Sequence, residues 1–146
     1  MNAAEFEHAL LADIPLARAM QLRVADYDGE RLVLVAPLAP NINDKGCAFG
    51  GSLVSLLTLA GWGLLVLKRG APDCDIYVRD SQAHYLAPVW TDFRAEARLA
   101  ADESWADFEA ALAARGRARI AVACRVPLAE GGDACRLTAR FVAVRR

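Results

Sequence analysis

Three polar side chains that could carry acid–base chemistry recur at alternate positions of one predicted strand, residues 76–86. Strict alternation from Ile76 places Asp80, Gln82 and His84 on the same face. A carboxylate or an imidazole can take a proton from water near neutral pH. Because buried polar groups need partners, this trio is either a satisfied structural network or a functional site. As a candidate base we rank Asp80 before His84.

The sulfur and imidazole side chains are not spaced as metal ligands. The cysteines form no Cys-x-x-Cys pair, and the two histidines, His8 and His84, lie far apart. We therefore predict no metal site, no bound cofactor, and free thiols that are buried. The four thiols are those of Cys47, Cys74, Cys124 and Cys135.

A long stretch without charged side chains lies between Lys45 and Lys68. Its length raises the question of a membrane span, which needs about 18 or more apolar residues. Several glycines and hydroxyl residues lower its hydrophobicity, and residues 46–52 have the composition of a glycine-rich turn. The remaining helix, 52–67, would be about 24 Å long, shorter than the ~30 Å hydrocarbon core of a bilayer. We predict a buried core helix and no membrane span.

Strands and short helices surround this core helix in the sequence. A first helix should end near Pro15, and Asp28-Gly29-Glu30 should close a hairpin. A short helix capped by Asp102 or Ser104 should end at Gly116. The predicted strands cover residues 22–27, 31–36, 76–86, 93–99, 118–126 and 135–144.

These elements predict an α+β protein, with residues 1–146 as a single domain. No alternation of strand and helix demands a parallel sheet. A helix that is apolar all round must be buried on all sides, which one antiparallel sheet cannot achieve. A second copy of the sheet, in a dimer, is the economical solution.

Composition narrows the classes of partner. The formal net charge is −1, and 55% of the residues are hydrophobic, as expected of a folded globular chain. Phosphate binding needs an excess of clustered Lys and Arg, so we predict no nucleic-acid partner. The N-terminal residues carry acidic side chains in a helical pattern, unlike a signal peptide, which favours a cytoplasmic protein.

The residues around the start of the core helix resemble a family signature. Asn43-x-x-Gly46-x-x-Phe49-Gly50-Gly51, followed by a long apolar helix, is similar to the Asn-x-x-Gly-x-x-His-Gly-Gly signature of hotdog-fold thioesterases. Within that superfamily the chain most resembles the YiiD-type thioesterase group, over most of its length. The other stretches that carry this likeness are 14–16, 41–43, 49–53, 59–63 and 85–88, together with Trp105 and Phe108.

The resemblance implies the hotdog fold, a long central helix wrapped by a curved antiparallel sheet of about six strands. It also implies a homodimer or a dimer of dimers, with active sites between subunits, and acyl-thioester substrates on coenzyme A or acyl carrier protein. Amides at a helix start are unpaired and lie at the positive end of the dipole, so Gly50 and Gly51 could bind a thioester carbonyl and its oxyanion. The alternative is that both glycines only permit a tight turn and close packing.

Two positions depart from the family pattern. Phe49 stands where many relatives have histidine, and Thr58 stands where they have a catalytic Asp or Glu. Thr58 could orient a water, or its hydroxyl could bond the carbonyl four residues back. In the fold that this chain resembles, strand 76–86 adjoins the dimer partner, so Asp80 would face the helix start of the other subunit.

Two further candidate residues, Asn43 and Ser52, each allow two interpretations. Asn43 could orient water or the carbonyl, or brace its loop. Ser52 is more readily a helix cap than a nucleophile. We assign substrate binding to Phe49, Ser52, Trp62, Gln82 and His84, with Trp62 and Phe49 setting the depth of the pocket.

Two functions from different classes follow. The first is a hydrolase of medium-sized acyl thioesters that uses water attack. The second is a non-catalytic acyl-thioester binding module, favoured by Thr58 in place of the carboxylate. A dehydratase of the same fold is weakened because the helix lacks a pair of histidine and carboxylate.

Overall fold

The computed structural model describes residues 1–70 and 72–146, which form four α-helices, one 3-10 helix and six strands. The strands are hydrogen-bonded in the order β1-β2-β4-β5-β6-β3, and every pair is antiparallel. The helices are α1 (Ala3–Asp13), α2 (Pro15–Met20), η1 (Ala39–Asn41), α3 (Gly50–Arg69) and α4 (Trp105–Arg115). The strands are β1 (Arg23–Tyr27), β2 (Leu32–Ala36), β3 (Cys74–Tyr85), β4 (Phe93–Leu99), β5 (Arg117–Pro127) and β6 (Asp133–Arg145).

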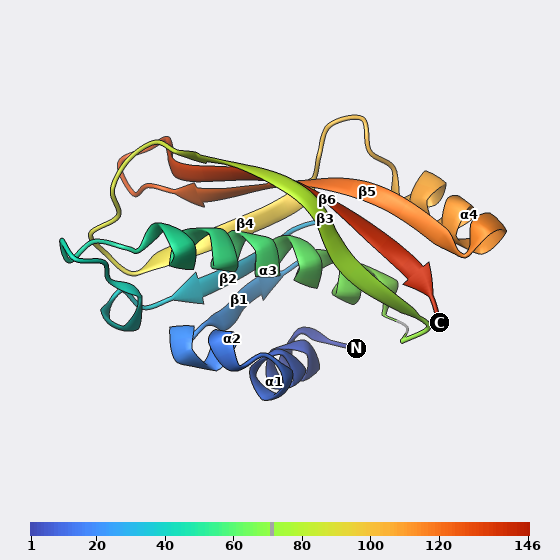
Figure 1. Ribbon diagram of the computed structural model, residues 1–146, viewed down its shortest axis with the longest axis horizontal. Coiled ribbons are helices and arrows are strands. Elements are labelled where there is room, and N and C mark those ends of the chain that lie inside the picture. The colour runs from blue at the N-terminus through green and yellow to red at the C-terminus, as the bar shows by residue number, and fades with distance from the viewer. Residues whose placement is uncertain (71) are drawn as a thin grey trace.

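The predicted α+β architecture is confirmed. Figure 1 shows α3 lying along one face of a curved sheet, with α1 and α2 beside it and α4 at the far end. Along β5 the side chains of Ile120, Val122 and Cys124 are buried on this inner face, as their alternation predicted. All four cysteines are free and buried, which also confirms the prediction.

Local sequence explains the short elements. Asp28 closes the β1–β2 hairpin by accepting hydrogen bonds from the amides of Glu30 and Arg31 at 2.9 and 2.7 Å. Ser104, one of the two predicted caps, accepts a hydrogen bond from the amide of Asp107 and begins α4. The helix α2 was not predicted: Pro15 does not only mark the end of α1, because it also occupies the first position of a new helix.

Small residues let α3 lie close to its neighbours. A Cβ atom on Gly61 would stand 2.8 Å from Val122, and one on Gly63 would stand 2.8 Å from Leu32 and closer still to the Phe6 ring. Within the part of the chain that is described, α3 is the one helix long and apolar enough to span a membrane, with a mean hydropathy of 1.8. Half of that window is buried against the sheet and α1, so α3 is the core helix that the sequence predicted.

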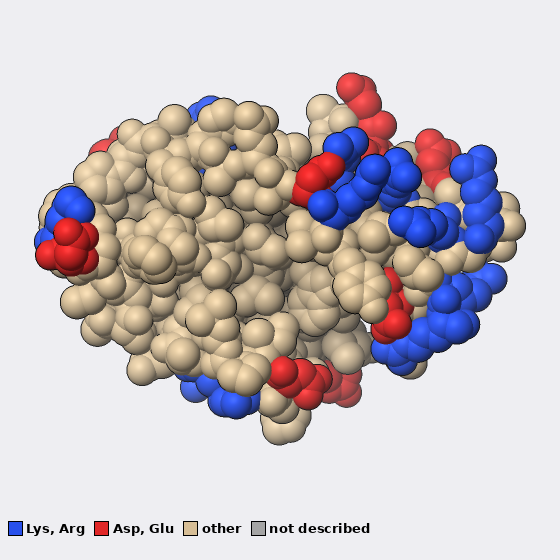
Figure 2. All heavy atoms as spheres, in the orientation of Figure 1, with Lys and Arg blue, Asp and Glu red and all other residues tan. Residues whose placement is uncertain are grey.

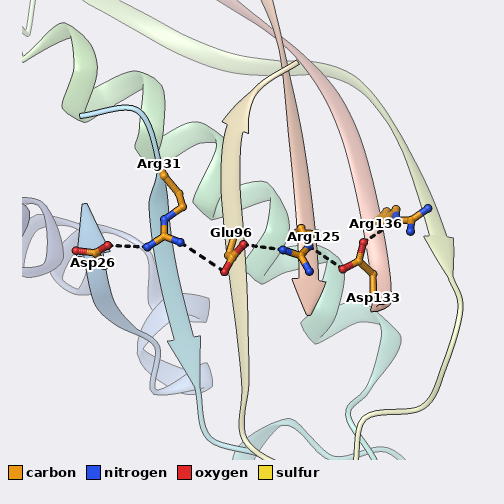
Figure 3. Close-up of polar contacts among 6 residues, drawn as sticks. All are labelled: Asp26, Arg31, Glu96, Arg125, Asp133 and Arg136. Atoms are coloured by element: carbon orange, nitrogen blue, oxygen red, sulfur yellow. Dashed lines mark hydrogen bonds and ion pairs between the residues drawn. The ribbon is translucent and has the colours of Figure 1, made fainter. Parts of the chain in front are cut away.

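The outer face of the sheet carries a row of alternating charges. Figure 3 shows this row running across the sheet from Asp26 to Arg136, with Glu96 between Arg31 and Arg125. At its end Asp133 accepts hydrogen bonds of 2.7 Å from both Arg125 and Arg136. The arginines of β5 therefore occupy an exposed face, on which Arg125 is ion-paired, whereas the apolar side chains point toward α3.

Candidate active site at the start of α3

The start of α3 presents backbone donors without partners. Phe49 is the N-cap residue, and its side chain makes no capping hydrogen bond. The first bond of the helix runs from the amide of Leu53 to the oxygen of Phe49, at 3.0 Å. Within the described residues nothing accepts a hydrogen bond from the amides of Gly50, Gly51 or Ser52. These amides lie at the positive end of a 20-residue helix and can bind a carbonyl oxygen or an anion.

The loop before α3 is fixed from both sides. The amide of Phe49 donates to the oxygen of Asn41 at 2.7 Å, and the amide of Ala48 donates to the oxygen of Val89 at 2.8 Å. Asn41 is only 2% exposed, and its side-chain amide donates to the oxygens of Met20 and Pro37. The helix start is therefore anchored to η1 and to the segment after β3, which pre-organises its amides.

Asn43 braces its own loop. Its side-chain oxygen accepts from the amides of Lys45 and Cys47 at 2.8 and 3.2 Å, and its side-chain nitrogen lies 3.2 Å from the Cys47 sulfur. This geometry matches the bracing role that the sequence left open.

Two aromatic rings flank the glycines. The hydroxyl of Tyr85 lies 3.4 Å from the oxygen of Gly50, and a Cβ atom on Gly50 would stand 3.2 Å from the Tyr85 ring. A Cβ atom on Gly51 would collide with the ring of Phe49. The side chains of Phe49 and Tyr85 are 55% and 58% exposed. Glycine at both positions leaves the amides open between the two rings.

An uncharged surface surrounds this point. Figure 2 shows that charged side chains on this view gather toward the end where α4 lies, and that the other half is largely free of them. The segments that meet at the helix start expose several large apolar side chains, namely Ile42, Phe49, Tyr85, Leu86 and Trp90. Such a surface suits an apolar ligand or a second protein surface.

The prediction that Asp80, Gln82 and His84 share the face of Ile76 is wrong. A β-bulge between Val78 and Asp80 shifts the register of β3 against β6 by one residue. Asp80 is therefore opposite Arg140, on the outer face of the sheet, and Gln82 and His84 follow it there. A slip of one residue moves every later side chain to the other face.

The inner face of β3 continues instead through Ser81, Ala83 and Tyr85, opposite the buried residues Ala139, Leu137 and Cys135. Tyr85 is thus the functional candidate that sequence reasoning missed. Its signal was present, because Ala83 and Tyr85 alternate with the polar residues at 82 and 84, in the opposite phase to Ile76 and Val78.

Asp80 is held in an ion pair. Arg140 donates to both carboxylate oxygens, in one case through Nε at 2.7 Å. These hydrogen bonds from Arg140 hold the pKa of the Asp80 carboxyl below its usual range. Asp80 is therefore an ionised carboxylate on the outer face, and within one chain it does not approach the start of α3.

A stripe of α3 faces the inner side of β3. Gly51, Ser55, Thr58 and Trp62 follow each other at helical spacing, and the indole nitrogen of Trp62 donates to the oxygen of Ile76 at 3.1 Å. Thr58 is half-buried, and among the described residues its hydroxyl has no hydrogen-bond partner. We considered two roles for this hydroxyl, and one of them, a hydrogen bond to the backbone carbonyl four residues back, is not formed.

Ser52 does not cap the helix. We predicted α3 to begin at residue 52, but it begins at Gly50, with Phe49 as the N-cap. Ser52 is therefore the third helical residue, and it contributes an unpaired backbone amide to the site.

The described residues do not indicate thiol or metal chemistry at this site. Burial raises the pKa of the Cys124 thiol to about 12, and it also raises the pKa of Cys135. In the described ranges, 1–70 and 72–146, no three His, Cys, Asp or Glu side chains are grouped so that they could hold a metal ion.

Comparison with known proteins identifies the family of this chain. The family described as "Putative thioesterase (yiiD_Cterm)" matches residues 3–145. A solved protein of unknown function from Chlorobaculum tepidum superposes with a TM-score of 0.89 at 27% identity, covering 99% of this chain and 94% of that one. A structure described as "the putative thioesterase from Shewanella oneidensis" gives a TM-score of 0.81 at 26% identity, covering 97% and 96% of the two chains.

The fold is shared more widely. A thioesterase from Haemophilus influenzae, at 12% identity, superposes with a TM-score of 0.77 over 99% of this chain and 92% of that one. The six-stranded antiparallel sheet around one long helix matches the structures of hotdog thioesterases. The predicted fold and the predicted resemblance are both confirmed.

Proposed function

Because the chain belongs to the YiiD_C thioesterase family, we propose that it hydrolyses acyl thioesters of coenzyme A or acyl carrier protein by direct attack of water. The observation that carries this proposal is the group of unpaired amides at Gly50, Gly51 and Ser52, open between two exposed aromatic rings.

The amides act on the carbonyl oxygen. As water attacks the thioester carbon, negative charge develops on this oxygen, and the amides of Gly50 and Gly51 stabilise it more strongly than they stabilise the ground state. The loss of one such donor typically costs about 3 kcal/mol of transition-state stabilisation. The sulfur then leaves as a thiolate, which is stable enough to depart with little protonation because thiols have a pKa of about 8.5.

Hydroxyl groups on α3 and β3 position the attacking water in this proposal. Apart from the Trp62 indole, which is bonded to Ile76, the polar side chains on the α3 stripe and on the inner face of β3 after the bulge are the hydroxyls of Ser55, Thr58, Ser81 and Tyr85. In our proposal Thr58 orients the attacking water, since its hydroxyl is uncommitted. Asp80 stays in its ion pair with Arg140. The attacking water therefore gives its proton to a hydroxide ion from the solvent, and the tetrahedral intermediate collapses by breaking the carbon–sulfur bond.

The working unit in this proposal is a homodimer or a dimer of dimers in the cytoplasm. Among the described residues, β3 is a 12-residue edge strand that pairs with β6 alone. Eight of its twelve residues are exposed, all of them after Ile76. Long open edges are normally protected by pairing, and a second copy of β3 would protect this one.

The alternative is a non-catalytic module that binds acyl thioesters. The α3 stripe supports this alternative because it carries hydroxyl groups but no carboxylate: Thr58 stands where relatives have a catalytic Asp or Glu. Both functions use the same amides and differ only in whether the bound water reacts.

Turnover of a panel of acyl-CoA thioesters, followed by thiol release, separates the two. Hydrolysis above the uncatalysed rate that is lost in Gly51→Val supports the hydrolase. Tight binding of the same thioesters by calorimetry with no thiol release selects the binding module. Neither turnover nor binding across the panel would overturn both.

A further inference from the structure

A buried asparagine connects three segments around the start of α3. Asn41, in η1, is the one buried residue with an amide or charged side chain in the described part of the chain. A buried amide is unfavourable unless its hydrogen bonds are made, so the partners of Asn41 indicate what holds it there. Its side chain offers two N–H donors and one oxygen acceptor, which differ in the partners that they find.

The side-chain nitrogen of Asn41 bridges two segments. It donates to the oxygen of Met20 at 2.9 Å and to the oxygen of Pro37 at 2.8 Å, so both of its protons are used. Met20 is the last residue of α2, and Pro37 directly follows β2. The side-chain oxygen has no partner among the described residues. The bonds of this side chain are therefore donated by the nitrogen, which an aspartate of the same shape lacks.

The end of α2 is shaped to accept one of these bonds. Gln21 takes the left-handed conformation, with φ of 55° and ψ of 36°, and ends the helix directly after Met20. This conformation is unfavourable for a residue with a side chain and persists where the surrounding contacts fix it. The amides of Gln21 and of the next residue bond back into α2, which leaves the oxygen of Met20 for Asn41.

The backbone of Asn41 passes this fixed position on to α3. Its amide donates to the oxygen of Leu38 at 2.8 Å, and its oxygen accepts from the amide of Phe49 at 2.7 Å. Phe49 is the N-cap residue of α3, so this bond fixes the point from which the unpaired amides of Gly50 and Gly51 follow. The end of α2, the end of β2 and the start of α3 are therefore joined through one residue.

We propose that Asn41 is a positioning residue for the hydrolysis: its side chain holds its backbone oxygen in place for Phe49 and thereby aims the amides of Gly50 and Gly51. The inference rests on the proposed function. Asn41 is buried and acts through Phe49, not on the substrate. A displacement of about 1 Å in a positioning group can cost about a hundredfold in rate. The proposal also gives α2 a role, as a support for the helix start.

The first test removes the two donated bonds. Asn41→Asp keeps the shape of the side chain but turns a carboxylate oxygen toward two carbonyl oxygens, and Asn41→Ala removes the bonds without adding a charge. In both variants kcat for an acyl-CoA should fall about tenfold to a hundredfold, while KM should change less than about threefold. The reason for this split is that the amides stabilise the developing oxyanion more than the ground state.

A matched control separates positioning from stability. The side chain of Asn2 caps α1 by accepting from the amide of Glu5 at 2.9 Å. Asn2→Ala should lower the melting temperature but leave kcat unchanged at a temperature where every variant is folded by circular dichroism. If folded Asn41→Ala keeps the kcat of the unaltered protein, or if it changes KM alone, the positioning role is overturned.

The second test follows the amide of Phe49 without any substrate. Its hydrogen exchange, measured by NMR, should be at least about tenfold faster in Asn41→Ala than in the unaltered protein. The amide of Ala48, which donates to the oxygen of Val89 at 2.8 Å, is the internal control and should keep its rate. An unchanged rate at Phe49 would show that the side chain of Asn41 does not hold this bond, and would overturn the inference.

Failure of the proposed function gives a different result. The unaltered protein would then release no thiol from any acyl-CoA, which removes the catalytic role of Asn41 together with hydrolysis. If the unaltered protein is active and Asn41→Ala speeds exchange at Phe49 but keeps full kcat, hydrolysis stands and the inference alone is overturned.

Discussion

The side chain of Tyr85 lies over the backbone of Gly50, with its hydroxyl 3.4 Å from the glycine oxygen, although the two residues are 35 positions apart in the chain. The contact joins the end of β3 to the start of α3. It places an exposed aromatic ring beside the amides that we propose to bind the thioester carbonyl.

Tyr85 should contribute through its ring more than through its hydroxyl. A hydrogen bond at 3.4 Å is long, so Tyr85→Phe should keep kcat/KM for an acyl-CoA within about threefold. Tyr85→Ala removes one wall beside the amides and should lower kcat/KM at least about tenfold. Steady-state kinetics of both variants checks this, and equal losses in the two would refute the role of the ring.

Gly51 should tolerate no side chain. In Gly51→Val the new side chain collides with the Phe49 ring and covers the adjacent amides, so kcat should fall about a hundredfold, as it does when an oxyanion donor is lost. The double variant Phe49→Ala/Gly51→Val removes the collision. Recovery of full activity in it would mean that ring displacement, rather than loss of the amides, caused the defect.

Thr58 should matter through its hydroxyl. Thr58→Val keeps the shape of the side chain but cannot orient water, and kcat should fall about tenfold, the equivalent of one hydrogen bond. Thr58→Ser retains the hydroxyl and should lose much less. If Thr58→Val is fully active, the water is positioned by another group.

The pH dependence should show no side-chain base on β3. Arg140 keeps the pKa of Asp80 below its usual range, so this carboxylate is ionised throughout the neutral range and cannot create an inflection there. The catalysed kcat/KM should rise about tenfold per pH unit from about pH 5 to about pH 8. Asp80→Asn and His84→Ala should give the same profile, and a plateau that either variant abolishes would reinstate that residue as the base.

The charge row on the outer face should stabilise the fold at neutral pH. Burial raises the pKa of Asp133, but the hydrogen bonds from Arg136 and Arg125 outweigh it, and the pKa is lowered overall. The stability that this carboxylate contributes is therefore present above its unfolded pKa of about 3.9 and is lost as the pH falls through its folded pKa.

Asp133→Asn should consequently lower the free energy of unfolding by about 1 to 3 kcal/mol at pH 7, since the side chain is only 9% exposed and accepts two charged hydrogen bonds. Urea denaturation at neutral and strongly acidic pH measures the difference, which should shrink in acid. A constant difference would show that packing, and not charge, is what the variant loses.

The local elements could be predicted from the sequence because their causes are local. Periodicity located α3 and the alternating strands β4, β5 and β6, and Asp28 and Ser104 marked a turn and a helix start by their own hydrogen bonds. The glycines at 50 and 51 identified the start of α3 as the candidate site, although Phe49 rather than a polar residue occupies the N-cap position.

The face to which each side chain of β3 belongs was decided only by the tertiary structure. One extra residue between Val78 and Asp80, accommodated by pairing with β6, turned Asp80, Gln82 and His84 outward and turned Tyr85 toward Gly50. The alternation of β3 changes phase after Val78, but the position of the bulge is fixed by the register of two strands some 60 residues apart in the chain, which that pattern does not give. The same holds for the partners of Asn41, which come from the end of α2, the end of β2 and the start of α3 and meet only once these elements pack together.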